Sequence, residues 1–168
     1  MWLVEEGVSN PQGEALVAEL RWIHDIIRTN LATIIEVIGQ IRNGVPLEQV
    51  RTQLDELAAT SVVWTLRVNC MRYCSLVHGH HHHEDVGWFP VLRRLNPELQ
   101  AVIDKLEADH TIVSGYLDSV EAAAMQIVSN ESARIELAEA LSKLAAHLLT
   151  HLDYEEASLM PTLRRISV

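Results

Sequence analysis

The sequence predicts an all-α protein: an up-down-up-down bundle of four long helices, with a short extra helical segment before the second long helix. Apolar residues recur every three or four positions along most of the chain, which is the period of an amphipathic helix. Glycine and proline are few, and long stretches contain neither. The chain is long enough for one well-filled core, so residues 11–166 are expected to form a single domain behind an N-terminal extension, residues 1–10.

The first helix is expected to begin at Ser9-Asn10-Pro11, where a capping side chain precedes a proline in the first turn. It should end at Asn43-Gly44, because glycine adopts the positive φ that follows many helices. His24 lies four residues after Leu20 and three before Ile27. It therefore falls on the buried stripe of this helix and not on the solvent-exposed face.

The next stretch of helical pattern has two segments that join at Thr60-Ser61, and the sequence is compatible with one helix or with two. Val45–Thr60 is expected to form the short helical approach, which restarts the chain at Pro46. Residues from Val62 to about Leu95 then form the long helix, whose apolar side includes His80 and Glu84. Pro90 lies inside this pattern and lacks a backbone N–H, so the helix should bend or end near it.

The third and fourth helices each follow a break in the apolar pattern. Asn96-Pro97 repeats the cap-plus-proline signal and starts a helix that reaches about Ile127, with His110 on its apolar stripe. Ser129-Asn130 precedes the fourth helix, which runs from Glu131 to about Arg165. This last helix carries three polar residues beside its leucine stripe: His147, His151 and Glu155.

One motif occurs twice at a fixed offset. His80-x3-Glu84-x5-Pro90-x-Leu92-Arg93-Arg94 returns as His151-x3-Glu155-x5-Pro161-x-Leu163-Arg164-Arg165. Residues four apart on a helix differ by roughly 40° in azimuth, so each copy presents one imidazole and one carboxylate in the same direction. With the histidines of the first and third helices, the pattern places one inward-facing histidine on each of the four helices.

These side chains have the composition of a metal site. A lone histidine on an apolar face is usually a core residue bonded to a carbonyl, but four histidines with two matched glutamates favour a shared cation. Buried ionised carboxylates are costly unless they are paired or bound to a metal. Two iron ions, each with two imidazoles and sharing two carboxylate bridges, would use all six groups. Mixed imidazole and carboxylate ligation suits iron or manganese, and zinc, which is also an alternative, would favour four-coordinate sites.

The arrangement His, His-x3-Glu, His, His-x3-Glu over four helices resembles the hemerythrin-like (HHE cation-binding) domain. The resemblance includes Trp88-Phe89-Pro90 and Glu155-Glu156 and covers nearly the whole chain. It implies a non-heme di-iron site with an oxo or hydroxo bridge. The ligands that it implies are His24, His80, Glu84, His110, His151 and Glu155.

The chain departs from the oxygen-carrying hemerythrins of invertebrates at two positions. Those proteins have a second histidine one turn on in the third helix, where this chain has Ser114. They also use an aspartate five residues after the last histidine, whereas Glu155 follows His151 by four. The pattern is more similar to that of the bacterial group linked with iron-dependent handling of peroxide, nitric oxide or oxygen.

Several further residues near the motif have alternative roles. His147 and His83 are the candidates for additional ligands; for His147, a ligand or supporting role stands against a solvated or capping one. His81 and His82 are expected to be exposed polar residues, and His78 is expected at the surface.

Composition narrows the class of function. A net charge of −10 argues against non-specific nucleic-acid binding, and no apolar run is long enough to span a membrane. The expected protein is cytoplasmic, a monomer or homodimer, with a small diatomic or peroxide ligand and an unidentified electron donor. The first hypothesis is a di-iron oxidoreductase that consumes peroxide or nitric oxide. The alternatives are a non-catalytic sensor or store for oxygen, nitric oxide or iron, and a purely structural bundle.

Overall fold

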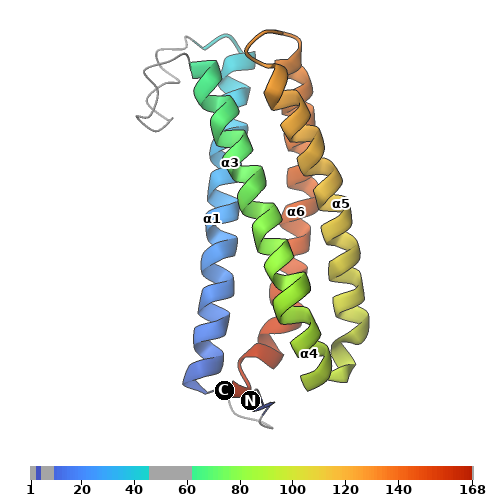
Figure 1. Cartoon of the computed structure of the whole chain (residues 1–168). Coiled ribbons are helices and arrows are strands. Elements are labelled where there is room, and N and C mark those ends of the chain that lie inside the picture. Colours follow the sequence, from blue (N-terminus) through green and yellow to red (C-terminus); the bar gives the residue numbers. More distant parts are fainter. Residues whose placement is uncertain (1–2, 5–9, 46–61, 168) are drawn as a thin grey trace.

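The computed structural model describes residues 3–4, 10–45 and 62–167, and it confirms the predicted bundle of four antiparallel helices (Figure 1). The helices are α1 (Pro11–Arg42), α3 (Val62–His83), α5 (Gln100–Gln126) and α6 (Ala133–Leu163). α3 continues through a π-helical turn (Glu84–Trp88) into α4 (Phe89–Leu95), and a 3-10 turn (Pro97–Leu99) precedes α5. Most of the predicted approach, residues 46–60, lies outside the described residues.

The four helices form a ring in which each contacts two others. α6 packs between α1 and α5, and α3 closes the ring on the opposite side, also between α1 and α5 (Figure 1). None of the helices in the described part of the chain is both long enough and apolar enough to cross a membrane. Because the four helices form this ring, side chains from all of them reach the central space of the bundle.

The ends of α1 follow the sequence signals. The Asn10 side chain accepts a hydrogen bond from the Gly13 N–H at 2.8 Å, and Gly44 has a φ of +74° after the last turn. Gly13 has a second role, because a Cβ at this position would lie 2.2 Å from the carbonyl oxygen of Arg164. The start of α1 thus packs directly on the backbone at the end of α6.

The two ends of the chain are paired by a short ladder that the sequence pattern did not predict. β1 (Leu3–Val4) and β2 (Ile166–Ser167) are antiparallel and lie beside the start of α1 (Figure 1). The N–H of Asn10 also donates to the Arg164 carbonyl at 3.1 Å. Part of the predicted N-terminal extension is therefore bonded to the end of the bundle.

The π-helical turn replaces the simple bend expected at Pro90. Because Pro90 has no N–H, it cannot donate to the carbonyl of Val86, four residues earlier. The preceding turn is widened, and the N–H of Phe89 bonds to the carbonyl of Glu84, five residues back. The irregular turn therefore begins at one of the residues with a predicted role in the metal site.

Two apolar clusters fill the bundle, and a polar layer separates them. The larger cluster contains Ile27 and Leu152, and the smaller one, near the chain ends, contains Leu20 and Leu159. His24 lies in sequence between the members from α1, and Glu155 lies between those from α6. The polar layer is thus enclosed by hydrocarbon on both sides along the bundle axis.

Candidate metal centre

The polar layer contains all six predicted ligand residues, and their side chains are almost completely buried. α1 supplies one histidine, α3 and the π-helical turn a histidine and a glutamate, α5 one histidine, and α6 the last pair. These residues are His24, His80, Glu84, His110, His151 and Glu155. The structure therefore brings together from four helices the groups that the sequence placed on inward faces.

Each glutamate lies between two imidazoles from different helices. Glu84 Oε1 is 3.3 Å from Nε2 of His80, and Glu84 Oε2 is 3.6 Å from Nε2 of His110. Glu155 Oε2 is 3.5 Å from Nε2 of His24 and 3.6 Å from Nε2 of His151. The Nε2 atoms of His24 and His80 are themselves only 3.1 Å apart. The carboxylates thus join two groups of imidazoles.

We call these two groups of imidazoles the first and second subsites. The first subsite contains His24 and His80, with Glu84 and Glu155 at its edge, and the second contains His81, His110 and His151. Within each group, the potential ligand atoms all lie within 4.8 Å of one another. This spacing suits one cation per subsite, with the two carboxylates between them.

The expectation that His81 is exposed is wrong. His81 is only 5 % exposed, and its ring stacks on that of His110 with centroids 3.9 Å apart. The reason is the register of α3, whose side toward α5 continues from Cys74 through Val77 to His81 at helical spacing. This buried stripe was visible in the sequence and could have identified His81.

The structure does not bring the other two candidate ligands into either subsite. His83 is exposed, and its ring lies beside that of Trp88 with centroids 6.5 Å apart. His147 is 30 % exposed, and its Nε2 lies 3.6 Å from Asp109 Oδ1. His147 therefore contacts Asp109, whose other carboxylate oxygen faces His151 of the second subsite, and does not itself reach the centre.

Two imidazoles are hydrogen-bonded from behind by carboxylates, and a third faces a carboxylate at a longer distance. Nδ1 of His24 is 2.9 Å from Glu156 Oε1, and Nδ1 of His110 is 2.7 Å from Asp85 Oδ1. Nδ1 of His151 faces Asp109 Oδ2 at 3.6 Å. A proton held on Nδ1 leaves the lone pair of Nε2 facing the centre, which is how carboxylates orient metal-binding histidines.

Sequence reasoning missed these carboxylates behind the histidines. Asp85 and Glu156 each follow a predicted ligand, and Asp109 precedes one. Their position next to a ligand was the only available signal. It could not show which histidine each would contact, because Asp85 and Glu156 contact histidines of other helices.

Many buried polar atoms in the layer lack a hydrogen-bond partner within the described protein. They include both carboxylate oxygens of Glu84 and of Glu155, and Nε2 of His81, His110 and His151. Folded proteins leave very few such atoms unsatisfied, because each costs about 1–3 kcal/mol or more. Since these atoms are all acceptors or potential metal ligands pointing to one region, cations would satisfy them together.

Burial sets the protonation states of the layer. It lowers the pKa of His24, His80 and His110 to about 3 and that of His151 to about 4. The imidazoles are therefore neutral at pH 7, as metal ligation requires. Burial raises the pKa of Glu155 to about 7, and burial beside Glu155 raises the pKa of Glu84 well above its ordinary value. Bound cations would displace these protons and restore both carboxylates.

These pKa shifts predict a stability maximum near pH 6.5 for the metal-free protein. Below that pH the unfolded chain binds more protons, because the buried imidazoles stay neutral when folded. Above it, the folded state keeps protons on Glu84 and Glu155 that the unfolded chain has released. Urea denaturation should therefore show stability falling as the pH rises from about 6.5 through the folded-state pKa of Glu155, about 7, by up to about 1.36 kcal/mol per pH unit for each retained proton.

The metal-loaded protein is the control for this pH dependence. Its carboxylates are ionised on the metal, so its stability should not fall over the same range. Stability of the metal-free protein that rises steadily from pH 6.5 to about 7 would contradict the proposed protonation of the two glutamates.

Comparison with models of protein families matches residues 47–163 to one described as Hemerythrin HHE cation binding domain. The match covers more than half of the chain and includes every histidine and glutamate of the polar layer except His24. Searches among curated proteins and among solved structures found no match.

Proposed function

Because the chain belongs to the hemerythrin HHE cation-binding domain family, we propose that its polar layer holds two iron ions, which bind or react with small oxygen and nitrogen ligands such as hydrogen peroxide, oxygen or nitric oxide. The observation that carries this proposal is the position of the two glutamates. Glu84 and Glu155 each lie between one imidazole of the first subsite and one of the second. With both cations bound, a carboxylate in that position would be placed to hold the two of them together.

The ligand set favours iron. The first subsite offers two imidazoles and the second offers three, and both share two carboxylates. Mixed imidazole and carboxylate ligation suits iron or manganese, and more than four ligands at the second subsite disfavours zinc. An oxo or hydroxo bridge would complete the pair. The first subsite, with fewer protein ligands, keeps open positions for an exogenous molecule.

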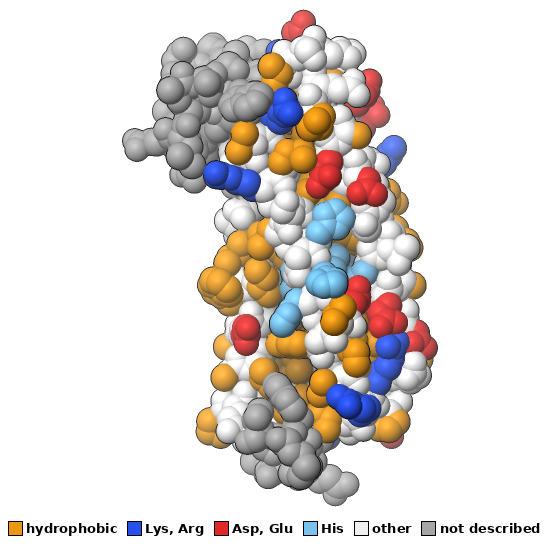
Figure 2. Space-filling model, in the orientation of Figure 1, with side chains coloured by type: hydrophobic (Ala, Val, Ile, Leu, Met, Phe, Trp, Pro, Cys, Tyr) orange, Lys and Arg blue, Asp and Glu red, His pale blue; other side chains and the backbone are white. Residues whose placement is uncertain are grey.

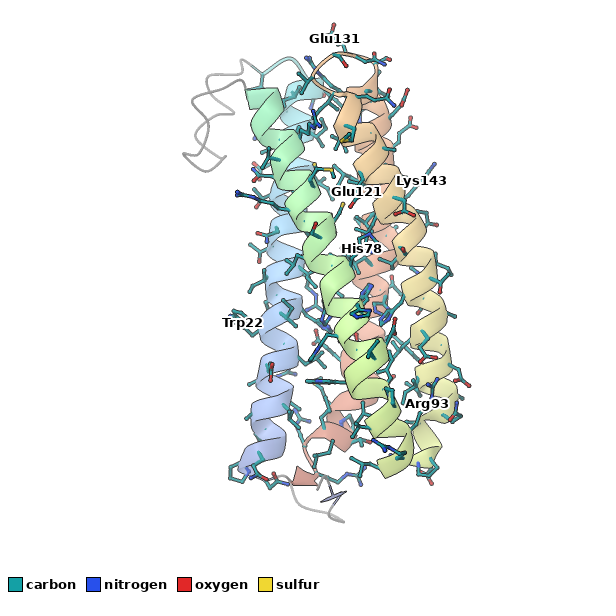
Figure 3. The ribbon with its side chains drawn as sticks, in the orientation of Figure 1. Trp22, His78, Arg93, Glu121, Glu131 and Lys143 are labelled. Carbon is teal, nitrogen blue, oxygen red and sulfur yellow. The ribbon has the colours of Figure 1, made fainter. Side chains whose placement is uncertain are left out.

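A groove gives access to the first subsite. It lies between α1 and α3, has a volume of about 390 Å³, and is lined by His80 and Glu84 together with apolar side chains that include Leu20, Trp22 and Ile23. Trp22 projects from α1 at the rim of the groove and is 64 % exposed (Figure 3). A small uncharged molecule can pass this apolar surface without losing strong interactions with water.

The protein side chains and the iron have separate tasks in this proposal. Bound iron supplies Lewis acidity and electrons. Glu156 and Asp85 orient the imidazoles of His24 and His110 by hydrogen bonds, and the apolar clusters exclude bulk water from the layer.

Peroxide consumption by the ferrous-loaded protein tests the proposed function. The Gly79→Trp variant should slow it by roughly tenfold or more, equivalent to about 1.4 kcal/mol in the barrier, because an indole would fill the groove. Iron content should stay unchanged, since a Cβ at Gly79 would have no neighbour within 4 Å and the backbone of α3 need not move. Gly39→Trp is the matched control, because Gly39 has equally open surroundings on α1 and does not line the groove.

Two results would contradict parts of this proposal. If the loaded protein leaves peroxide unchanged but forms a stable, reversible adduct with oxygen or nitric oxide, the function is sensing or storage and not turnover. If both tryptophan variants react at the wild-type rate, the groove is not the route to the first subsite.

A further inference from the structure

Three histidines of the run at residues 78–83 are not used by the metal centre, and two of them line a second opening. This opening is a polar pocket of about 450 Å³ between α3 and α5. His78 and His82 lie at its rim, together with Asp118 of α5. Figure 2 shows pale-blue histidine side chains gathered on this face of the molecule, close to acidic side chains, and Figure 3 shows His78 on α3 beside α5.

The pocket leads inward to the second subsite. His81 and His110 also line it, and each is only 5 % exposed. Nε2 of His81 is buried and has no hydrogen-bond partner within the described protein. The pocket therefore connects the imidazoles of His78 and His82, which contact solvent, with buried imidazoles of the metal centre. His81, whose Nε2 has no hydrogen-bond partner in the described residues, lines its inner end.

The charge and ligand types at the rim suit a divalent cation. Nε2 of His78 lies 4.0 Å from Asp118 Oδ1, and the lining includes Asp85 but no lysine or arginine. Imidazole and carboxylate are the groups that bind iron and similar metals. The other opening, between α1 and α3, combines histidine and glutamate side chains with large apolar ones, including Trp22 and Trp88. The opening between α3 and α5 has no comparable aromatic or aliphatic lining, so it is the more polar of the two.

We propose that the polar pocket is the entry port through which divalent metal ions reach the buried centre. His78, His82 and Asp118 capture the hydrated cation at the rim, and His81 receives it at the inner end. Negative charge in a cleft raises the local concentration of cations and speeds their association. The proposal rests on the proposed metal centre, but it adds a role for residues that do not belong to that centre.

The rate of cobalt uptake tests this port, with Co²⁺ added alone to the metal-free protein and followed by its visible absorption in a stopped-flow instrument. The His78→Gln/His82→Gln double variant and Asp118→Asn should each load at least about threefold more slowly, near the low end of the effects of charged clefts on association. The final amount of bound cobalt and the final spectrum should equal those of the wild type, because no ligand of the centre has changed.

Two matched controls separate the port from general effects. His83→Gln removes an exposed histidine of the same run that lines the opposite groove. Glu131→Gln removes an exposed acid at the far end of the bundle (Figure 3). Both should load at the wild-type rate.

The outcomes distinguish the port from the centre. Uptake by the double variant at the rate of His83→Gln would overturn the port and leave the centre intact. A double variant that binds less cobalt at the end point, with unchanged uptake of the rest, would also overturn it, because the rim would then be a separate static site. Wild-type protein that binds no cobalt would overturn both proposals.

Discussion

Replacing Glu84 by glutamine should abolish tight binding of the metal pair and, at the same time, stabilise the metal-free protein. Glu84 is 2 % exposed, neither of its oxygens has a hydrogen-bond partner in the described protein, and it faces imidazoles of both subsites. Because Glu84 is placed to bridge both cations, its replacement affects the binding of both. Metal affinity should therefore fall by more than the roughly 10- to 100-fold that follows the loss of a residue hydrogen-bonded to a ligand. Glutamine keeps the shape but supplies no anionic bridge.

The gain in stability has a separate cause. Burial raises the pKa of the Glu84 carboxyl group. At pH 8 the metal-free protein therefore loses stability, either by binding a proton that the unfolded chain has released or by burying a negative charge. A neutral amide avoids that cost, so the free energy of unfolding in urea should rise by about 1–2 kcal/mol at pH 8. Metal affinity is measured by competition with a chelator. Glu139→Gln, at an exposed position of α6, should change neither quantity.

Opposite effects on binding and stability distinguish a metal ligand from a structural residue. A glutamate that holds the bundle together would destabilise the metal-free protein when replaced. If Glu84→Gln lowers the stability of the metal-free protein and leaves metal affinity unchanged, Glu84 is not a bridging ligand.

Replacing His81 by leucine should weaken binding at the second subsite and leave the first subsite nearly unchanged. His81 shares its subsite with His110 and His151, and leucine can fill the buried space without offering a ligand atom. A titration with Fe²⁺ under anaerobic conditions should then become biphasic. One equivalent of Fe²⁺ should bind at the first subsite with wild-type affinity, and the other should bind at the second subsite at least about 10-fold more weakly.

His83→Leu is the matched control for this variant. It removes a neighbouring histidine of the same run that is exposed and belongs to neither subsite, so both equivalents should bind as in the wild type. Wild-type affinity for both ions in His81→Leu would show that His81 is a packed core residue and not a ligand.

Most of the fold could be predicted from the sequence because its signals are local. Helical periodicity, the cap at Asn10 and the positive φ of Gly44 each depend on a few neighbouring residues. The β1–β2 pairing could not be predicted, because two-residue strands carry no periodic pattern. The bend at Pro90 was predicted, but its form as a π-helical turn depends on how the helix continues on its neighbours.

The candidate site was predictable as far as helix faces determine it. The repeated His-x3-Glu motif identified the residues that converge in the polar layer. The choice between His81 and His83 was harder, because α3 contacts both α1 and α5 and therefore has two buried sides. His83 was expected near the centre from its distance to His80 alone, whereas the stripe through Cys74 and Val77 decides in favour of His81. Contacts such as Asp85 to His110 depend on the relative rotation of two helices.

The most direct test of the dinuclear centre is the iron content and electron paramagnetic resonance spectrum of the protein after ferrous loading and oxidation. The account predicts two iron ions per chain and a loss of the ferric signal, because ions joined by shared carboxylates and an oxo or hydroxo bridge couple magnetically. One iron per chain with the signal of an isolated ferric ion, or no bound iron, would contradict it.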